Sequence, residues 1–283
     1  MYTAEELVCA TQLAYCDFDK YEDKEKTVAD ILNLKENKYE IYYSYSKEKE
    51  DEATGDDATM IQSTKDFIDA IAAGEKCMGW KIVDVKNDES DSGLYAVVIE
   101  TGEDEAIIAF RGSESYLHGT LSAEQVCKDW IQADLQILYG GLTAQEQAAC
   151  QYMNEIADSP AFDKYQKIAL TGHSLGGNLA LVSTIYTATE EGKKNTDLAS
   201  RIVQSVSMDG PGHPQEFIDK YQDAINEMQG VMTHYHWSLV GSILKSVCRE
   251  KSEKYETRTS AEIYLAADIL GEDRQLYGMA KAS

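Results

Sequence analysis

The sequence predicts an α/β domain with a mostly parallel central sheet, helices on both faces and an antiparallel N-terminal edge. One observation is a strand–turn–helix, in which the apolar run Ile168–Thr171 leads into GHSLGG and then into a helix with apolar residues at intervals of three and four. A second is a pair of strand-like runs, Leu94–Glu100 and Ala106–Phe110, joined by the hairpin-type turn TGED. The third is the alternation of strand and helix patterns that follows. Because ligands bind at the carboxyl ends of parallel strands, we expect the chemistry there.

The other elements follow from the same kinds of signal. Thr3 and Glu6 form a capping box that predicts an N-terminal helix. The charged stretch 47–57 is interpreted as a loop, and the next helix is expected from residue 63 to Gly74. The later elements are expected to be the strand Trp80–Val85, the helix Thr143–Asp158, the strand Arg201–Met208, one helix from Phe217 to Met228, the strand Val231–Tyr235 and a polar helical tail over Ser252–Ser283.

Length and composition limit the possible classes. A chain of 283 residues with 3 prolines suits one domain over residues 1–283, with a helical N-terminal segment at 1–75. Its 50 acidic and 26 basic residues give a net charge of −24, which disfavours nucleic acid and anionic membranes as partners. There is no apolar run of transmembrane or signal length, so a cytoplasmic protein is the default expectation, with leaderless export left open. The 6 cysteines are scattered without metal-ligand spacing, so we expect reduced, apolar cysteines and neither a metal nor a cofactor.

The segment GHSLGG matches the G-x-S-x-G pattern of a nucleophile turn, with Ser174 as the candidate nucleophile. The serine of such a turn is strained, and Gly172 and Gly176 stand where side chains would collide with neighbouring backbone. The Leu175 N–H, at the start of the following helix, would face a developing oxyanion. An ordinary strand-to-helix turn is the alternative.

Three segments, IIAFRGSES, GHSLGGNLA and SMDGPG, occur in this order with helical spacers. Together they resemble the lipase-type α/β-hydrolases, especially fungal-type triacylglycerol lipases and related bacterial lipase-like proteins. The resemblance covers about Trp80 to Leu244 and implies an α/β-hydrolase fold. It also implies that Ser113 supplies the second oxyanion-hole N–H and that 114–125 is a lid, although this segment can equally be a loop. Arg111 is expected to pair with Asp129 or Asp134 and so hold its loop.

The acid of the expected triad has two candidate positions. Fungal-type lipases carry it in a segment resembling T-H-x-x-D-x-V, where this chain has Ser238. A serine does not stabilise an imidazolium as a carboxylate does. Asp209, at the end of the preceding strand, is therefore the better candidate. The alternative is that Asp209 caps the turn and the helix that follow.

The base must be a histidine, and none follows His236. His236 is favoured, and His234 is the alternative; we expect only one of the two to face Ser174. His173 is expected to be a structural hydrogen-bond partner that points away from the site, and His213 would need a tight fold-back to reach it. The remaining alternative is that the chain has no competent base.

Two classes of function remain. The first is a serine hydrolase that cleaves an acyl ester or lipid through an acyl-enzyme on Ser174. The second is a degenerate or truncated hydrolase fold that serves as a binding or effector module. A nucleotide-binding protein is disfavoured, because GHSLGG lacks the Lys-Ser/Thr of a P-loop. The sequence does not indicate an oligomeric state.

Overall fold

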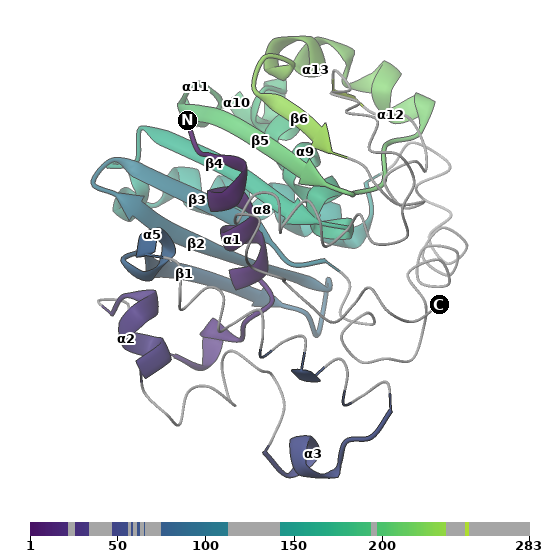
Figure 1. Ribbon diagram of the computed structural model, residues 1–283. Helices are drawn as coiled ribbons and strands as arrows, with labels where there is room; N and C mark the ends of the chain where they lie inside the picture. The colour runs from purple at the N-terminus through teal and green to yellow at the C-terminus, as the bar shows by residue number, and fades with distance from the viewer. Residues whose placement is uncertain are drawn as a thin grey trace.

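The computed structural model describes residues 1–21, 26–33, 47–55, 58, 61–62, 65, 75–112, 142–193, 197–235 and 247–248. A six-stranded sheet runs through the molecule in the order β1-β2-β3-β4-β5-β6 (Figure 1). The strands are β1 (Lys81–Asp88), β2 (Leu94–Gly102), β3 (Glu105–Phe110), β4 (Lys167–His173), β5 (Ile202–Met208) and β6 (Met232–Tyr235). The first three strands pair antiparallel, and β3 to β6 pair parallel. The predicted mixed sheet with an antiparallel N-terminal edge is confirmed.

The helical elements of the N-terminal part are α1 (Ala4–Leu13), the 3₁₀ turn η1 (Phe18–Lys20), α2 (Val28–Asn33), α3 (Lys47–Glu52) and α5 (Glu75–Met78). Those of the later part are α8 (Ala144–Asp158), η4 (Pro160–Phe162), α9 (Leu175–Thr187), α10 (Glu190–Lys193), α11 (Leu198–Arg201), α12 (Gln215–Lys220) and α13 (Gln222–Met228). The capping box before α1 is present, with the Thr3 and Glu6 side chains each bonded to the other's backbone N–H.

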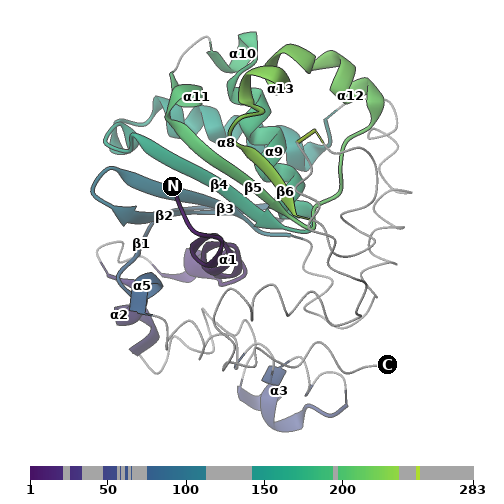
Figure 2. The same cartoon turned by 45° about the horizontal axis from the view of Figure 1, so that its top comes forward.

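The two faces of the sheet are covered in different ways (Figure 2). Since consecutive strands are neighbours and parallel crossovers are right-handed, the crossover helices α8, α9 and α13 all lie on one face. The opposite face is covered by α1, whose Leu7 and Leu13 are buried against the sheet. Full burial of a leucine side chain contributes about 1.5–3 kcal/mol, so α1 is firmly anchored.

The strand register brings several strand ends to one edge. Phe110 pairs with Gly172, His173 with Met208, and Met208 with Tyr235. The residues that follow β3, β4 and β5 therefore leave the sheet at the same carboxyl edge, which is where the sequence predicted the chemistry.

Two expectations for elements are wrong. The stretch expected to be a charged loop contains α3, because Lys and Glu are good helix formers and Glu50 pairs with Lys65. The helix expected from Phe217 to Met228 is divided into α12 and α13, because Tyr221 leaves the helical conformation, with φ −108° and ψ 19°. The lid segment, the polar tail and all but residue 65 of the helix expected from residue 63 to Gly74 lie outside the described residues.

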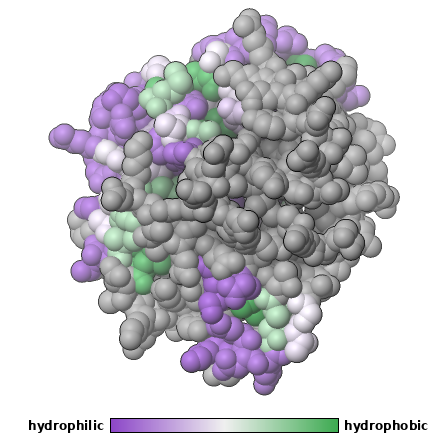
Figure 3. Space-filling view, viewed as in Figure 1, coloured by the Kyte–Doolittle hydropathy of each residue, from purple (hydrophilic) through white to green (hydrophobic). Residues whose placement is uncertain are grey.

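The described surface is polar, and the described cysteines are buried. Figure 3 shows hydrophilic residues over most of the coloured part of one face, with apolar residues in small groups. Among the described residues, Met1 is the one large apolar side chain that is exposed. No helix in these ranges is long and apolar enough to span a membrane. The described cysteines are free thiols, as expected: Cys9, Cys16, Cys77, Cys150 and Cys248.

Candidate active site at the carboxyl edge of the sheet

Ser174 stands at the junction of β4 and α9 in a strained conformation. Its φ of 54° and ψ of −130° lie in a region that L-residues rarely occupy, at a cost of about 1–3 kcal/mol. The turn is held from both sides, because the Ser174 N–H donates to the carbonyl of Met208 at 2.9 Å and the Ser174 carbonyl accepts from the N–H of Gly177 at 2.9 Å. The strand, the turn and the helix lie where the sequence predicted them.

The two glycines of the motif leave no room for side chains. A Cβ on Gly176 would lie 2.2 Å from the carbonyl oxygen of Phe110, and one on Gly172 would lie 2.3 Å from the carbonyl of Gly176. The turn is therefore packed directly against the end of β3. This close approach is the physical reason for glycine at both positions.

The start of α9 and the end of β3 both lie next to the serine. Leu175 is the first residue of α9, so its N–H has no partner within the helix and lies at the positive end of the helix dipole. On the other side, a Cβ on Gly112 would lie 3.4 Å from the Cβ of Ser174. Ser113, the second predicted oxyanion donor, follows Gly112 and lies outside the described residues.

Asp209 directly follows β5 at the same edge, in the left-handed region with φ 53°. Its N–H donates to the carbonyl of Tyr235 at 2.7 Å, and the residue is buried. Helix α12 begins later and has Pro214 as its N-cap. Asp209 is therefore not the cap of that helix, and its role as an acid or as a turn residue stays a prediction.

The His173 side chain points toward α1. Its Nδ1 lies 3.3 Å from the Tyr15 hydroxyl, so the expected structural hydrogen bond is present. Burial lowers the pKa of His173 below its ordinary value, and the nearby carboxylate of Asp209 acts in the opposite direction. The candidate acid is thus close enough to His173 to influence its charge.

His234 and His213 lie on the face of the sheet that α9 covers. His234 is 2% exposed, with Nδ1 3.2 Å from the Ser207 hydroxyl. His213 accepts a hydrogen bond from the Asn178 side chain at 3.3 Å and stacks on Phe217. Burial, with a smaller contribution from His234, lowers the pKa of His213 to about 3.

Within the described residues, no hydrogen bond joins a histidine side chain to Ser174. His236, the favoured base, follows Tyr235 and lies outside these residues, as does His118. The identity of the base therefore stays a prediction. The described part of the chain also contains no cluster of three potential metal ligands.

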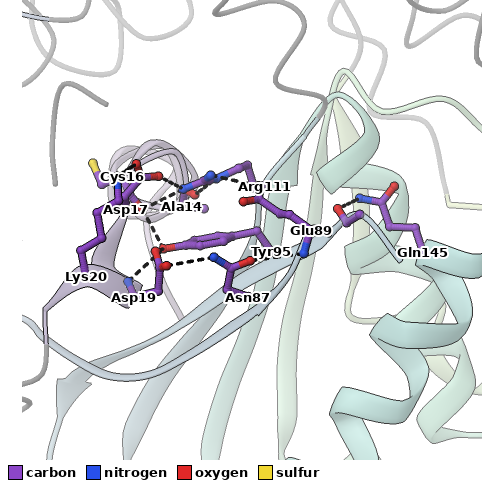
Figure 4. A network of polar contacts seen from close by, with 11 residues as sticks. Ala14, Cys16, Asp17, Asp19, Lys20, Asn87, Glu89, Tyr95, Arg111 and Gln145 are labelled. Atoms are coloured by element: carbon purple, nitrogen blue, oxygen red, sulfur yellow. Dashed lines mark hydrogen bonds and ion pairs between the residues drawn. The ribbon is translucent and has the colours of Figure 1, made fainter. Parts of the chain in front are cut away.

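Arg111 is buried at the end of β3 and forms ion pairs with two acids. The guanidinium is 2% exposed and lies 3.0 Å from both Asp17 and Glu89 (Figure 4). The acids predicted from the sequence, Asp129 and Asp134, lie outside the described residues. No local pattern near the start of the chain indicated that α1 would meet the end of β3, because this contact depends on tertiary packing.

The mixed sheet, its two helical layers and the strained serine turn at its carboxyl edge define an α/β-hydrolase-like fold. A profile of the Mbeg1-like family matches residues 78–254, and the chain belongs to this family. A comparison with curated proteins found no match.

Among solved structures, the chain is similar to M37 lipase, at 15% identity with a TM-score of 0.43, covering 100% of this chain and 84% of the other. It is also similar to the mono- and diacylglycerol lipase from Aspergillus oryzae, at 13% identity with a TM-score of 0.42, covering 93% and 85%. A fungal lipase–inhibitor complex is similar at 19% identity with a TM-score of 0.33, covering 65% and 71%.

Proposed function

We propose that this protein hydrolyses carboxylic esters through an acyl-enzyme on Ser174. The observation that carries the proposal is the conformation of Ser174, held at φ 54° between β4 and α9. Strained backbone of this kind persists only where its surroundings enforce it, and it clusters at functional sites. The turn leaves Ser174 partly exposed at the edge where ligands of α/β folds bind.

The reaction follows from the groups at this edge. Ser174 Oγ attacks the ester carbonyl carbon while His236 takes its proton, with His234 as the alternative base. The N–H groups of Leu175 and Ser113 stabilise the oxyanion, and Asp209 orients the imidazole and stabilises its charged form. The alcohol leaves with the proton, and a water molecule activated by the same base then releases the acid.

The backbone supports Asp209 and His236 as partners. The Asp209 N–H is bonded to the carbonyl of Tyr235, the residue that precedes His236 in the sequence. An acyl ester, either a lipid or a small ester, is the proposed substrate class.

The second candidate is a binding or effector module that retains the fold without catalysis. It is favoured by Ser238 at the usual acid position and by the absence of any histidine after His236. The burial of His234 against Ser207 also favours it, because this removes one candidate base from solvent.

Hydrolysis of p-nitrophenyl acetate, butyrate and octanoate separates the two candidates. We expect turnover of at least one ester by the wild type and a loss of about a thousandfold or more in Ser174→Ala. Ser159→Ala, at the end of α8 and the opposite edge of the sheet, is the matched control and should keep the wild-type rate. Equal rates in the wild type and Ser174→Ala would contradict the proposal.

A further inference from the structure

The carboxyl end of β3 is fastened to the C-terminal end of α1, on the face of the sheet opposite the crossover helices. The last carbonyl groups of a helix have no partners within it and carry a partial negative charge. Arg111 donates to carbonyls at and just after this end of the helix, with Nε 2.8 Å from the carbonyl oxygen of Ala14, the C-cap residue, and Nη2 2.9 Å from the carbonyl oxygen of Cys16. A planar guanidinium fits such a set of acceptors, which a lysine ammonium does not match.

The same guanidinium is held by charge and by stacking. It lies 3.0 Å from the carboxylates of Asp17 and Glu89 and 3.6 Å from the ring centroid of Tyr95 (Figure 4). The hydroxyl of Tyr95 in turn donates to the carbonyl of Cys16 at 3.0 Å. Since Arg111 is buried and surrounded on several sides, the backbone that it carries has little freedom.

Tyr15 connects the segment after α1, to which Arg111 is bonded, with the serine turn. A Cβ on Gly112 would lie 2.5 Å from the Tyr15 hydroxyl and 2.6 Å from the carbonyl oxygen of His173. The hydroxyl also lies 3.3 Å from the His173 Nδ1. Tyr15 is therefore in contact with the ends of both β3 and β4, beside the residues that adjoin Ser174.

We propose that Tyr15 and Arg111 are positioning residues of the site, through which the C-terminal end of α1 supports the ends of β3 and β4. They hold Gly112 and His173 on either side of Ser174, so that the serine and the N–H groups around it keep their reacting geometry. The inference rests on the proposed function, because it assigns these residues to acylation of Ser174. A displacement of about 1 Å at a reacting group can cost a hundredfold in rate, so small losses of order should be measurable.

The chain offers a matched control for each positioning residue. Tyr2→Phe removes a hydroxyl bonded to Thr101 at 2.7 Å, just before the start of α1. Arg201→Lys alters another buried arginine bonded to backbone carbonyls, at the start of β5 and the opposite edge of the sheet. The test variants are Tyr15→Phe, which is matched by Tyr2→Phe, and Arg111→Lys, which is matched by Arg201→Lys. Within each pair, the test and the control remove the same kind of hydrogen bond.

The first measurement is hydrogen exchange by mass spectrometry, which does not depend on activity. In Tyr15→Phe and Arg111→Lys, we expect faster exchange in peptides that contain Phe110–Gly112 and Gly172–Leu175. Tyr2→Phe and Arg201→Lys should leave these peptides unchanged. Unchanged exchange in both test variants would overturn the inference, whether or not the protein is an enzyme.

The second measurement is the rate of fluorophosphonate labelling at a temperature where every variant is folded. We expect the maximal labelling rate to fall about tenfold in Tyr15→Phe, the equivalent of one lost hydrogen bond, with an unchanged half-saturating probe concentration. The maximal labelling rate should fall further in Arg111→Lys. In the two control variants it should stay within twofold of the wild-type rate. If Arg111→Lys fails to fold, Tyr15→Phe alone decides.

The outcomes separate the two proposals. Wild-type protein that is labelled at the same maximal rate as Tyr15→Phe would overturn the positioning role and leave the proposed function standing. Wild-type protein that is not labelled would overturn the proposed function and the positioning role in acylation, and the exchange data would still decide whether α1 holds the strand ends.

Discussion

The end of β4 and the ends of β5 and β6 lie at the same edge of the sheet, but they are specified differently. At β4, the strained Ser174 and the glycines on either side of it fall within five residues, so one continuous motif marks the turn. At β5 and β6, Asp209 lies near His173 while His234 is bonded to Ser207. The nucleophile end is therefore marked by one short segment of sequence, whereas the acid–base end is assembled from residues on separate strands.

This difference explains why the role of Ser174 can be assigned from its own turn, whereas the roles of the acid and the base depend on their neighbours. A turn built from Gly172, Ser174 and Gly176 has few alternatives once the strand and helix form. A carboxylate or an imidazole can serve catalysis, a turn or a buried hydrogen bond, and only its surroundings decide.

Asp209→Asn tests the acid. Asparagine tolerates the left-handed conformation at φ 53°, so the backbone should be kept while the charge is lost. We expect ester hydrolysis to slow by about 10³- to 10⁴-fold, because the imidazolium loses its stabilising partner. Asp163→Asn, at the exposed residue that follows η4, is the control. A rate within twofold of the wild type would make Asp209 a turn residue only.

His236→Ala and His234→Ala test the base. We expect His236→Ala to slow hydrolysis by about a thousandfold through loss of general-base catalysis. His234→Ala should instead lower the free energy of unfolding by about 2 kcal/mol, because it removes a buried hydrogen bond and leaves a cavity. Both variants are measured by ester hydrolysis and by thermal unfolding. The reverse pattern would reassign the base to His234.

Gly176→Ala tests the local turn. Its Cβ would lie 2.2 Å from the carbonyl oxygen of Phe110, so the turn must shift, and we expect a loss of about 3 kcal/mol in the free energy of unfolding. Gly230→Ala has open space around the new Cβ and should change stability by no more than about 0.5 kcal/mol. Chemical denaturation measures both variants. Equal stability of the two would show that the turn is not packed against β3.

The buried His213 predicts a pH dependence of stability. In the folded state its pKa is about 3, so it stays neutral while the unfolded chain takes up a proton below about pH 6.5. Stability should therefore be highest above this pH and fall as the pH is lowered, by about 3 kcal/mol at pH 4 from this group alone. The measurement is the difference between wild type and His213→Gln in denaturation from pH 7 to pH 4. If the free energies of unfolding of the two proteins changed in parallel with pH, the predicted contribution of His213 would be contradicted.

The sheet was largely predictable from the sequence, because its strands are apolar runs separated by clear turns. The α3 helix was missed because charged residues suggested a loop, although Lys and Glu favour helices. The break at Tyr221 carries neither proline nor glycine, the usual local signals of interruption.

The candidate site was predictable only where it is local. The turn at Ser174 follows from one continuous motif, and the capping box of α1 from another. The contacts of Arg111 with Asp17 and of Tyr15 with His173 join residues more than ninety positions apart. No periodicity or motif encodes such pairs, because they arise when α1 packs across the sheet.

Covalent labelling of the wild-type protein by a fluorophosphonate probe, with and without mild detergent, tests the central claim most directly. The probe reports an activated serine without presupposing a substrate, and peptide mass spectrometry locates the adduct. We predict an adduct on Ser174 that is absent from Ser174→Ala and lost or strongly slowed in Asp209→Asn. A folded protein that forms no adduct on Ser174 under either condition would contradict the hydrolase account and favour a binding role for this fold.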